Sequence, residues 1–306
     1  MNPPDGPGGL ELFEGERRRL TGLAYRITAS IPDAEDVVQE TWLRWSAADK
    51  ESIVNPAGWL TTVASRLALD RLRAQRRRRE VYVGPWLPDP VTNEPSPEES
   101  AELAESLTVG FLVVLDRLGP AERVAFLLGD VFGEPYPVIA ETLGKSEDAC
   151  RQLLSRARRK VRDARPTSRG DIPSPAPLGL LGELMTAVLQ GEEERALGLL
   201  DPEVVLVSDA GPGRRAARHP VVGAHRVRRL ISGGWRLFGF KARPTDPGQL
   251  PPARIATVNS TPSIVFDAEG GPVVLSAETA DGRITRIWVR LNPDKTAALD
   301  GPVELI

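Results

Sequence analysis

The sequence has 306 residues, of which 41% are hydrophobic and 26% are charged, and its formal net charge is −3. This length allows two or three domains with hydrophobic cores. One cysteine and two histidines exclude a disulfide framework and argue against a Cys/His metal site. No stretch resembles a signal peptide or reaches membrane-spanning length, so we expect a cytoplasmic protein without membrane contact. Basic residues concentrate at 71–79 and 151–165, which indicates local positive surfaces.

Two helices are predicted near the N-terminus, at residues 10–29 and 33–45. The second, DAEDVVQETWLRW, begins with Asp33 as the expected cap and Asp36 completing a capping box. Its apolar face comprises Val37, Val38, Thr41, Trp42 and Trp45. The outward face comprises Glu35, Asp36, Gln39 and Glu40. Such an acidic and amide face can bind a basic partner, or it can simply favour the helix dipole.

The stretch NPAGWLTTVASRLALDRLRAQRRRRE at 55–80 predicts a helix capped by Asn55, with Pro56 at its first position. Leu60, Val63, Ala64 and Leu67 form its apolar face. The polar residues expected to point elsewhere are Thr61, Thr62, Ser65, Arg66, Asp70 and Arg73. The arginines after residue 70 concentrate more charge than a solvated helix needs, so phosphate is the expected partner. A helix C-terminus stabilised by its dipole is the alternative.

The next stretch, VYVGPWLPDPVTNEPSPEES at 81–100, is predicted to be a linker. Its five prolines are incompatible with a helix or a central strand. Trp86 and Leu87 are unusually apolar for a linker. We expect them either to dock on another part of the chain or to form an exposed apolar patch.

Helices predicted at 102–118 and 120–131 precede a strong local signal. A short helix at 136–143, a turn at Gly144 and Lys145, and a longer helix capped by Ser146 form a predicted helix-turn-helix. The inner face of the longer helix comprises Ala149, Cys150, Leu153, Ala157 and Val161, and the outward face Arg151, Gln152, Ser155, Arg158 and Arg159. Such a helix can enter a DNA major groove, and plain antiparallel helix packing is the alternative.

After a Pro/Ser-rich linker at 166–177, the sequence predicts strands as well as helices. Helices are predicted at 178–190, 192–200 and 221–231, and strands at 203–208, 253–258, 263–266, 273–277 and 284–291. The turn-forming stretches AEGG and TADG connect the last three strands. The order predicts an α+β domain in which a curved sheet with an antiparallel meander wraps helices.

DAEDVVQETWLRW, NPAGWLTTVASRLALDRLR with its arginine run, and PYPVIAETLGKSEDACRQLLSRARRKV together resemble the extracytoplasmic-function class of RNA polymerase sigma factors. The resemblance covers residues 10–163 in the expected order and spacing. It implies two all-α domains, sigma region 2 at 10–80 and the helix-turn-helix region 4 at 101–165. It also implies that the chain binds the β′ clamp helices and β flap of core RNA polymerase and directs transcription initiation at promoter DNA.

The resemblance also implies roles for individual positions. The polymerase-binding residues would be Asp36, Gln39, Glu40 and Trp42. The −10 promoter element would face Thr62, Arg66, Asp70, Arg73, Arg76 and Arg77. The −35 element would face Arg151, Gln152, Ser155, Arg156 and Arg158. Arg66 replaces an asparagine common at its position, so the −10 base preference does not transfer.

Residues 178–306 look like the SnoaL-like cone fold, which a subgroup of these sigma factors carries as a fused domain. WLPDP at 86–90 and NPDKT at 292–296 resemble marks of the subgroup, and DAGPGR at 209–214 resembles a third, interrupted by Ala210 and Pro212. Subgroup membership implies that this domain regulates sigma activity in cis. The implied regulatory contacts are Trp86, Leu87, Pro88, Asp209, Asn292, Pro293, Asp294 and Lys295.

An enzyme of the cone fold needs a carboxylate base in an apolar pocket. The best candidate set is Asp209 with His219 or His225, beside a loop charged by arginines, and we expect no catalysis, cofactor or metal. An unknown small-molecule ligand in the C-terminal domain is compatible with the sequence. The alternative function is a ligand-sensing helix-turn-helix regulator that acts without binding polymerase.

Overall fold

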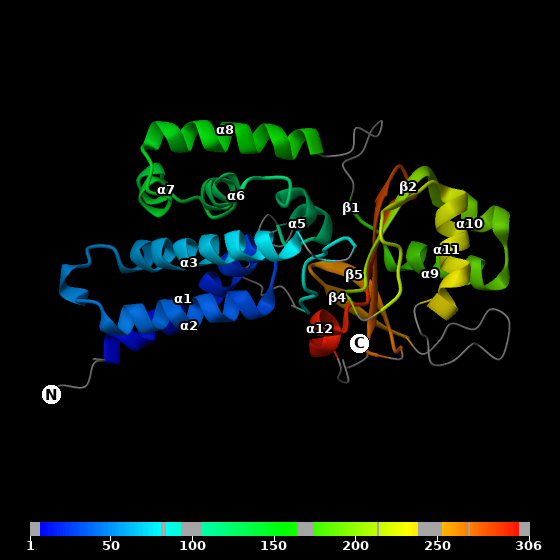
Figure 1. Ribbon diagram of the computed structural model, residues 1–306, viewed down its shortest axis with the longest axis horizontal. Helices are drawn as coiled ribbons and strands as arrows, with labels where there is room; N and C mark the ends of the chain where they lie inside the picture. The colour runs from blue at the N-terminus through cyan, green and yellow to red at the C-terminus, as the bar shows by residue number, and fades with distance from the viewer. Residues whose placement is uncertain are drawn as a thin grey trace. The chain divides into compact units, whose positions relative to one another are not determined.

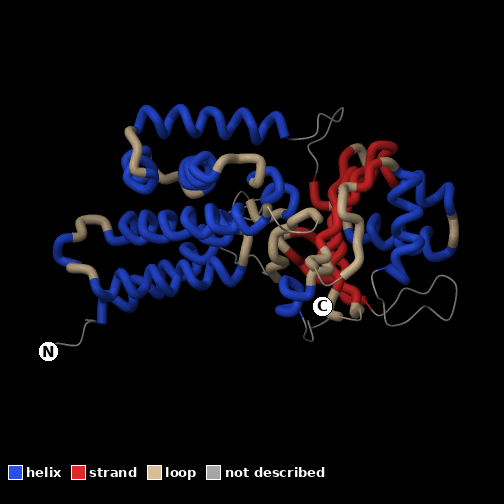
Figure 2. Tube along the Cα trace, viewed as in Figure 1, coloured by secondary structure: helices blue, strands red, loops and turns tan. Residues whose placement is uncertain are grey.

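The computed structural model describes residues 7–80, 82, 84–92, 106–164, 174–212, 214–237, 253–268 and 270–299. The chain divides into two compact units. The first unit comprises residues 1–80 and 111–164, and the second comprises residues 81–110 and 165–306. The first unit is helical, whereas the second contains a sheet (Figures 1 and 2). None of the described helices is long and apolar enough to cross a membrane.

The N-terminal part of the first unit is built from three helices, α1 (Pro7–Thr28), α2 (Ile31–Ala47) and α3 (Pro56–Arg79), with a 3₁₀ turn at Lys50–Ser52. All three pack against one another, and Phe13, Leu20 and Leu60 are completely buried between them. The predicted start of α3 is confirmed, because Asn55 Oδ1 accepts a hydrogen bond of 3.0 Å from the Gly58 N–H.

The predicted start of α2 is wrong by two residues. The helix begins at Ile31, and Ser30 rather than Asp33 is its cap. Ser30 Oγ accepts a 3.4 Å hydrogen bond from the Asp33 N–H. Pro32 explains the earlier start, because proline is well tolerated in the first turn, where its missing N–H costs no helical hydrogen bond.

The second half of the first unit contains α5 (Val109–Leu115) from Phe111 onward, α6 (Pro120–Phe126), a π-helical turn (Leu127–Val131), α7 (Tyr136–Leu143) and α8 (Glu147–Ala164). The helix-turn-helix prediction is confirmed. Gly144 ends α7 in a left-handed conformation with φ of 61°, and Ser146 Oγ accepts a 3.3 Å hydrogen bond from the Ala149 N–H. Of the helix predicted at 102–118, residues 106–108 form a turn and Val109–Leu115 are helical, whereas residues 102–105 lie outside the described residues.

In the second unit the helices are α9 (Leu178–Gln190), α10 (Glu193–Leu199), α11 (Ala224–Leu237) and α12 (Pro293–Thr296), followed by a 3₁₀ turn (Ala297–Leu299). The strands are β1 (Ser174–Pro175), β2 (Leu200–Asp209), β3 (Val221–Val222), β4 (Ala253–Val258), β5 (Thr261–Phe266), β6 (Val273–Ala280) and β7 (Arg283–Arg290). The sheet order is β3-β2-β7-β6-β5-β4, and β1 pairs with β6.

The predicted meander is confirmed, since β4 to β7 are successive antiparallel neighbours. The sheet is mixed, however, because β2 runs parallel to β7. The helix predicted from Val221 begins only at Ala224, because Val221 and Val222 pair with β2. Gly223, with φ of 100°, makes the turn between strand and helix.

The two faces of this sheet have different coverings. Helices α9, α10 and α11 lie on one face (Figure 1), where they pack on a hydrophobic core that includes Ile287 and Val289 of β7. Alternation along the strand turns Arg290 away from this core. Ser263, Ser276 and Arg290 are all buried polar residues and are hydrogen-bonded to one another. Asn259 links this polar group to the proline-rich segment, because it accepts a hydrogen bond from Arg290 and donates to the carbonyl oxygens of Asp89 and Val91.

Candidate functional site

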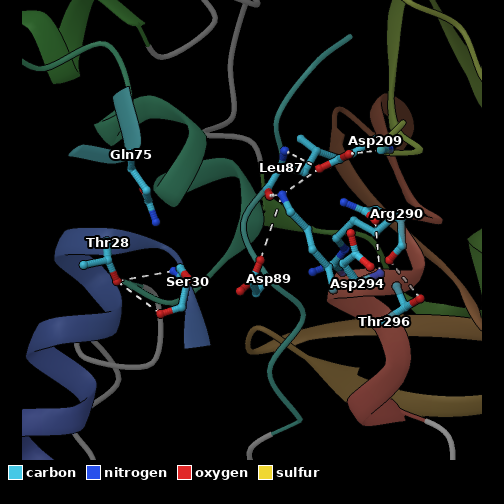
Figure 3. Close-up of polar contacts among 12 residues, drawn as sticks. Thr28, Ser30, Gln75, Leu87, Asp89, Asp209, Arg290, Asp294 and Thr296 are labelled. Carbon is cyan, nitrogen blue, oxygen red and sulfur yellow. Dashed lines mark hydrogen bonds and ion pairs between the residues drawn. The ribbon is translucent and has the colours of Figure 1, made fainter. Parts of the chain in front are cut away.

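The segment that contains WLPDP lies on the C-terminal domain, and we call the place where it binds the linker-docking site. It comprises Tyr82 and residues 84–92 together with Asp209, Asn259, Arg290, Asn292 and Lys295. Figure 3 labels Leu87, Asp89, Asp209 and Arg290 of this site. Leu87 is 1% exposed, although it belongs to a proline-rich stretch. The Leu87 N–H donates to Asp209 Oδ2 at 2.9 Å, and Lys295 Nζ donates to the Leu87 carbonyl.

A buried ion pair forms the centre of the site. Asp209 ends β2 and Lys295 lies in α12, and their charged atoms are 2.8 Å apart. The side chain of Asp89 brings a second carboxylate oxygen within 3.9 Å of Lys295 Nζ. A buried ion pair is favourable only when further hydrogen bonds replace the lost water. Here the linker provides several of them, through the Leu87 backbone and Tyr82.

Two aromatic rings from the linker complete the surroundings of Lys295. Its Nζ lies 3.4 Å from the centre of the Trp86 ring and 5.8 Å from that of Tyr82. Both are cation–π contacts, which strengthen when the cation is shielded from water. Burial, together with the hydrogen bond to Asp209, raises the pKa of Tyr82. The Tyr82 hydroxyl therefore stays protonated and donates to Asp209 Oδ1, while it accepts a 3.0 Å bond from Asn292 Nδ2.

A second group of contacts holds the linker further along. Thr92 forms an antiparallel bridge with Val258, at the end of the edge strand β4. The Asn259 N–H donates to the Val91 carbonyl at 2.8 Å, and Asn259 Nδ2 donates to the Asp89 carbonyl at 3.4 Å. Because these bonds use the linker backbone, they fix its path as an added strand would.

The two other motifs meet beside the ion pair. Asn292 Oδ1 caps α12 by accepting a 3.1 Å hydrogen bond from the Asp294 N–H, and Pro293 occupies the first helical position. Gly211 lies against Asn292, since a Cβ at Gly211 would come within 2.6 Å of the Asn292 side chain. Gly211 also has a φ of 63°, which favours glycine. Thus WLPDP, DAGPGR and NPDKT converge, and the Asp294 side chain is exposed at the rim.

In the first unit, the residues assigned to the −35 element form one exposed face of α8. All five are exposed, namely Arg151, Gln152, Ser155, Arg156 and Arg158. Arg151 pairs with Glu147 and Asp148 of its own helix. Arg158 pairs with Asp130 at 2.6 Å. The outward face predicted from the sequence is confirmed, and its arginines are available at the surface.

The polar face of α3 is less exposed than the sequence predicts. Thr61, Thr62 and Ser65 are buried, since α1, α2 and α7 all pack on α3 within this unit and Arg19 of α1 donates a hydrogen bond to Thr61. The expectation that these residues point away from the packed face is therefore wrong here. Arg66 donates to the carbonyl oxygens of Glu141 and Thr142 at the end of α7. Helix-end carbonyls attract cations, so this contact holds α7 to α3.

The remaining −10 residues differ in exposure. Asp70 and Arg73 are exposed and pair with each other at 3.1 Å, and Arg77 is exposed. Arg76 is half-buried, because it donates to the carbonyl oxygens of Asp116 and Leu118. The arginine run is therefore divided between exposed side chains and side chains that bind the second half of the unit.

A charge cluster around the half-buried Asp116 is one feature that was not predicted from the sequence. The Asp116 carboxylate binds Arg79 and Arg123, each at 2.8 Å, and Arg123 also donates to the Arg26 carbonyl. Burial favours a raised pKa for Asp116, but the two guanidinium groups outweigh it and lower the pKa. Burial lowers the pKa of Arg123 to about 10. Hydrophobic periodicity does not indicate which charged residues meet. Arg79 and Asp116 also lie in segments that are far apart in the sequence.

The residues assigned to polymerase binding lie on α2. Asp36 and Gln39 are exposed. Asp36 pairs with Arg71 of α3 at 3.0 Å, and Glu40 pairs with Arg44 at 3.1 Å. Trp42 is half-buried against Phe13, with ring centres 4.9 Å apart. The surface is thus acidic at one end and aromatic at the other.

The candidate catalytic set is not assembled. Asp209 is committed to Tyr82, Leu87 and Lys295, and both His219 and His225 are exposed. No group of three or more potential metal ligands occurs among the described residues.

Comparisons with known proteins cover nearly the whole chain. The family described as Sigma-70 region 2 matches residues 12–78, and that described as Sigma-70, region 4 matches residues 110–161. The chain is 38% identical to the ECF RNA polymerase sigma factor SigJ of Mycobacterium tuberculosis, over 92% of this chain and 91% of that protein. It is 35% identical to the probable ECF RNA polymerase sigma factor SigI of the same species, over 92% of each chain. The crystal structure of M. tuberculosis SigJ superposes with a TM-score of 0.74 at 35% identity, over 96% of this chain and 100% of that one.

Proposed function

The chain belongs to the extracytoplasmic-function RNA polymerase sigma factors, and we propose that its linker-docking site regulates the transcription initiation that such a factor directs. The observation that carries the sigma-factor function is the presence of both sigma regions, in order, in a chain similar to SigJ over nearly its full length. The regulatory part rests on the contacts of the linker.

The partners follow from this function. We propose that Asp36, Gln39, Glu40 and Trp42 bind the β′ clamp helices of core polymerase, and that region 4 binds the β flap. The exposed face of α8 would read the −35 duplex, since a basic helix of a helix-turn-helix fits the major groove. Residues 62–77 of α3 would hold the −10 strand, where an arginine-rich face suits a displaced single strand.

The closed arrangement of the first unit competes with this DNA binding. Arg66 donates through Nε and Nη2 to the end of α7, so these donors are not available to a promoter strand in this arrangement. Arg76 and Arg79 are likewise bound to the segment around Asp116. Opening the contacts between α3 and the second half of the unit would therefore release three arginines for DNA.

The linker connects the two halves of the first unit, since residues 81–110 lie between them in sequence. When residues 84–92 are docked, only part of the linker is free to let the halves separate. Docking thus favours the closed arrangement, and undocking favours an open one, which is a two-state element that can regulate a sigma factor.

Run-off transcription with bacterial core polymerase, on the promoter of the protein's own operon, tests both parts. A transcript that depends on the added protein is expected. The Trp86→Ala/Leu87→Ala variant removes the cation–π contact with Lys295 and the buried anchor, so its transcript yield should differ from that of the unmodified chain. Thr92→Ala is the matched control, because its side chain is exposed and its bridge uses the backbone. Equal yields from all three proteins would contradict regulation by the linker.

A further inference from the structure

A pocket of about 330 Å³ opens in the second unit next to the linker-docking site. Its walls include Gly84 of the linker, Ser208 of β2, and Arg214, Arg215 and Arg218. This volume is at the lower end of the range for small-molecule sites. Apart from Gly84, the residues that line the pocket do not belong to the linker-docking site, so linker docking alone does not account for its composition.

The charged residues that line the pocket are all basic. Three arginines line it, and none of its lining residues is acidic. Arg214 is half-buried, and its guanidinium donates to the neutral carbonyl oxygens of Gly271 and Leu291, at 3.2 and 3.1 Å. Burial lowers the pKa of Arg214. Among the described residues, no carboxylate forms an ion pair with Arg215 or Arg218.

The nearest carboxylate in sequence does not balance this charge. Asp209 is 1% exposed, and its two oxygens are occupied by Lys295, the Leu87 N–H and Tyr82. The negative charge of Asp209 is balanced by Lys295 and does not compensate Arg215 or Arg218. A concave surface that presents the guanidinium groups of Arg215 and Arg218 attracts anions, and the guanidinium fork matches carboxylate and phosphate oxygens.

The walls of the pocket are fixed in place by contacts on either side. Ser208 Oγ donates to the Ala217 carbonyl at 3.2 Å, which holds the arginine loop against β2. Gly84, with φ of 93°, brings the linker backbone close to the same loop, since a Cβ there would lie 3.8 Å from the Arg218 Cα. The pocket thus has one wall on the linker and another on the C-terminal domain.

We propose that this pocket binds a small anionic ligand bearing phosphate or carboxylate groups, and that the bound ligand holds the linker in its docked position. The coupling follows from the two walls, because a ligand that contacts both binds the docked state more tightly than the undocked one. The consequence for transcription rests on the proposed regulatory function of the linker, whereas binding itself does not.

Calorimetric titration of the full-length protein with pyrophosphate and with citrate, at physiological ionic strength, tests the binding. Comparing the two probes distinguishes a phosphate ligand from a carboxylate ligand. Arg215→Gln/Arg218→Gln should weaken binding of the preferred probe by at least about tenfold, the loss expected for charge-assisted hydrogen bonds. Arg226→Gln/Arg229→Gln is the matched control, because both arginines are exposed on α11 and outside the pocket. Saturable binding that the first variant leaves unchanged would overturn the proposal, as would binding of duplex DNA but of neither probe.

Hydrogen exchange of residues 84–92, measured with and without the preferred probe, tests the contact with the linker. The Leu87 N–H is bonded to Asp209, so ligand that holds the linker docked should slow its exchange. Saturable binding with unchanged exchange would overturn the linker as a wall of the site. Neither measurement involves polymerase, so a failure here is distinguishable from a failure of the regulatory function, which the transcription assay reports.

Discussion

Lys295 is the residue on which the linker-docking site depends most. It is 7% exposed, and Asp209, Asp89 and the Leu87 carbonyl surround its ammonium group. Removing one member of a buried ion pair leaves the other charge uncompensated, which costs about 3–5 kcal/mol, whereas replacing both members with neutral groups costs much less. The balance of charges, more than any single contact, therefore stabilises the docked linker.

This balance gives a prediction at the level of the pair. Asp209→Ala should lower the free energy of unfolding of the second unit by about 3–5 kcal/mol, because it leaves the Lys295 charge buried. The double variant Asp209→Asn/Lys295→Met should lose clearly less free energy of unfolding than Asp209→Ala does. Urea denaturation of the full-length variants, followed by tryptophan fluorescence, measures the difference. A double variant that loses as much stability as Asp209→Ala would show that the unpaired Lys295 charge does not cause the loss.

Glu278 gives a pH-dependent prediction. Burial raises the pKa of its carboxyl group, although Arg286 opposes the shift. The folded state therefore holds the proton more tightly than the unfolded chain, and Glu278 lowers stability as the pH rises from about 4.5 to its folded pKa. Glu278→Gln removes this effect, so the variant should gain stability relative to the parent between about pH 4 and about pH 8.

Urea denaturation at the two pH values tests this difference. Glu203→Gln, at an exposed position of the same domain, is the control for the loss of a surface carboxylate. A Glu278→Gln variant whose advantage is the same at both pH values would contradict the titration of this carboxyl group.

At the scale of elements, local chemistry was predictable and tertiary burial was not. Asn55 and Ser146 cap their helices as the sequence indicates, and the meander of β4 to β7 follows from alternating strands and turns. The burial of Thr62 on α3 could not be predicted, because it depends on which helix packs there. The parallel pairing of β2 with β7 is likewise a contact between distant segments.

In the candidate site, too, the local motifs could be predicted, whereas the contacts between distant segments could not. WLPDP, Asp209 and NPDKT were singled out as motifs, and the structure brings Trp86, Leu87, Asp209, Asn292 and Lys295 together. Tyr82, Asn259 and Arg290 were missed, because their roles arise from burial and hydrogen bonding across the sheet. A resemblance can mark a motif, but only the fold shows which residues complete it.

The packing of α7 on α3 gives a prediction at this scale. Arg66→Ala removes the hydrogen bonds to the end of α7, so the amides of α7 should exchange faster with solvent. Arg73→Ala is the matched control, since Arg73 lies on the same helix and pairs only with the neighbouring Asp70 among the described residues. Hydrogen exchange with mass spectrometry compares the variants. Equal exchange of α7 in both would mean that apolar packing alone holds the two helices together.

At the scale of the whole molecule, the main feature is that the first unit is discontinuous in sequence. Its two halves are joined by residues 81–110, which belong to the second unit. A fully extended chain spans at most about 3.3–3.6 Å per residue, so a released linker of this length would allow separations of up to roughly 100 Å. In the proposed regulation, docking of residues 84–92 shortens the chain that can extend between the two halves, and the C-terminal domain would act on the first unit through that length.

This mechanism predicts that undocking the linker lengthens the distance between α2 and α8. Spin labels on Glu35→Cys and Arg159→Cys, both at exposed positions, would report it by pulsed electron paramagnetic resonance, and the single native Cys150 is buried. Adding Trp86→Ala/Leu87→Ala should shift the distance distribution to longer values and broaden it, whereas adding Thr92→Ala should not. If the distribution stays narrow in the undocked variant, the Asp116 cluster and the Arg66 contact suffice to keep the unit closed, and the release of those contacts would be the regulated step.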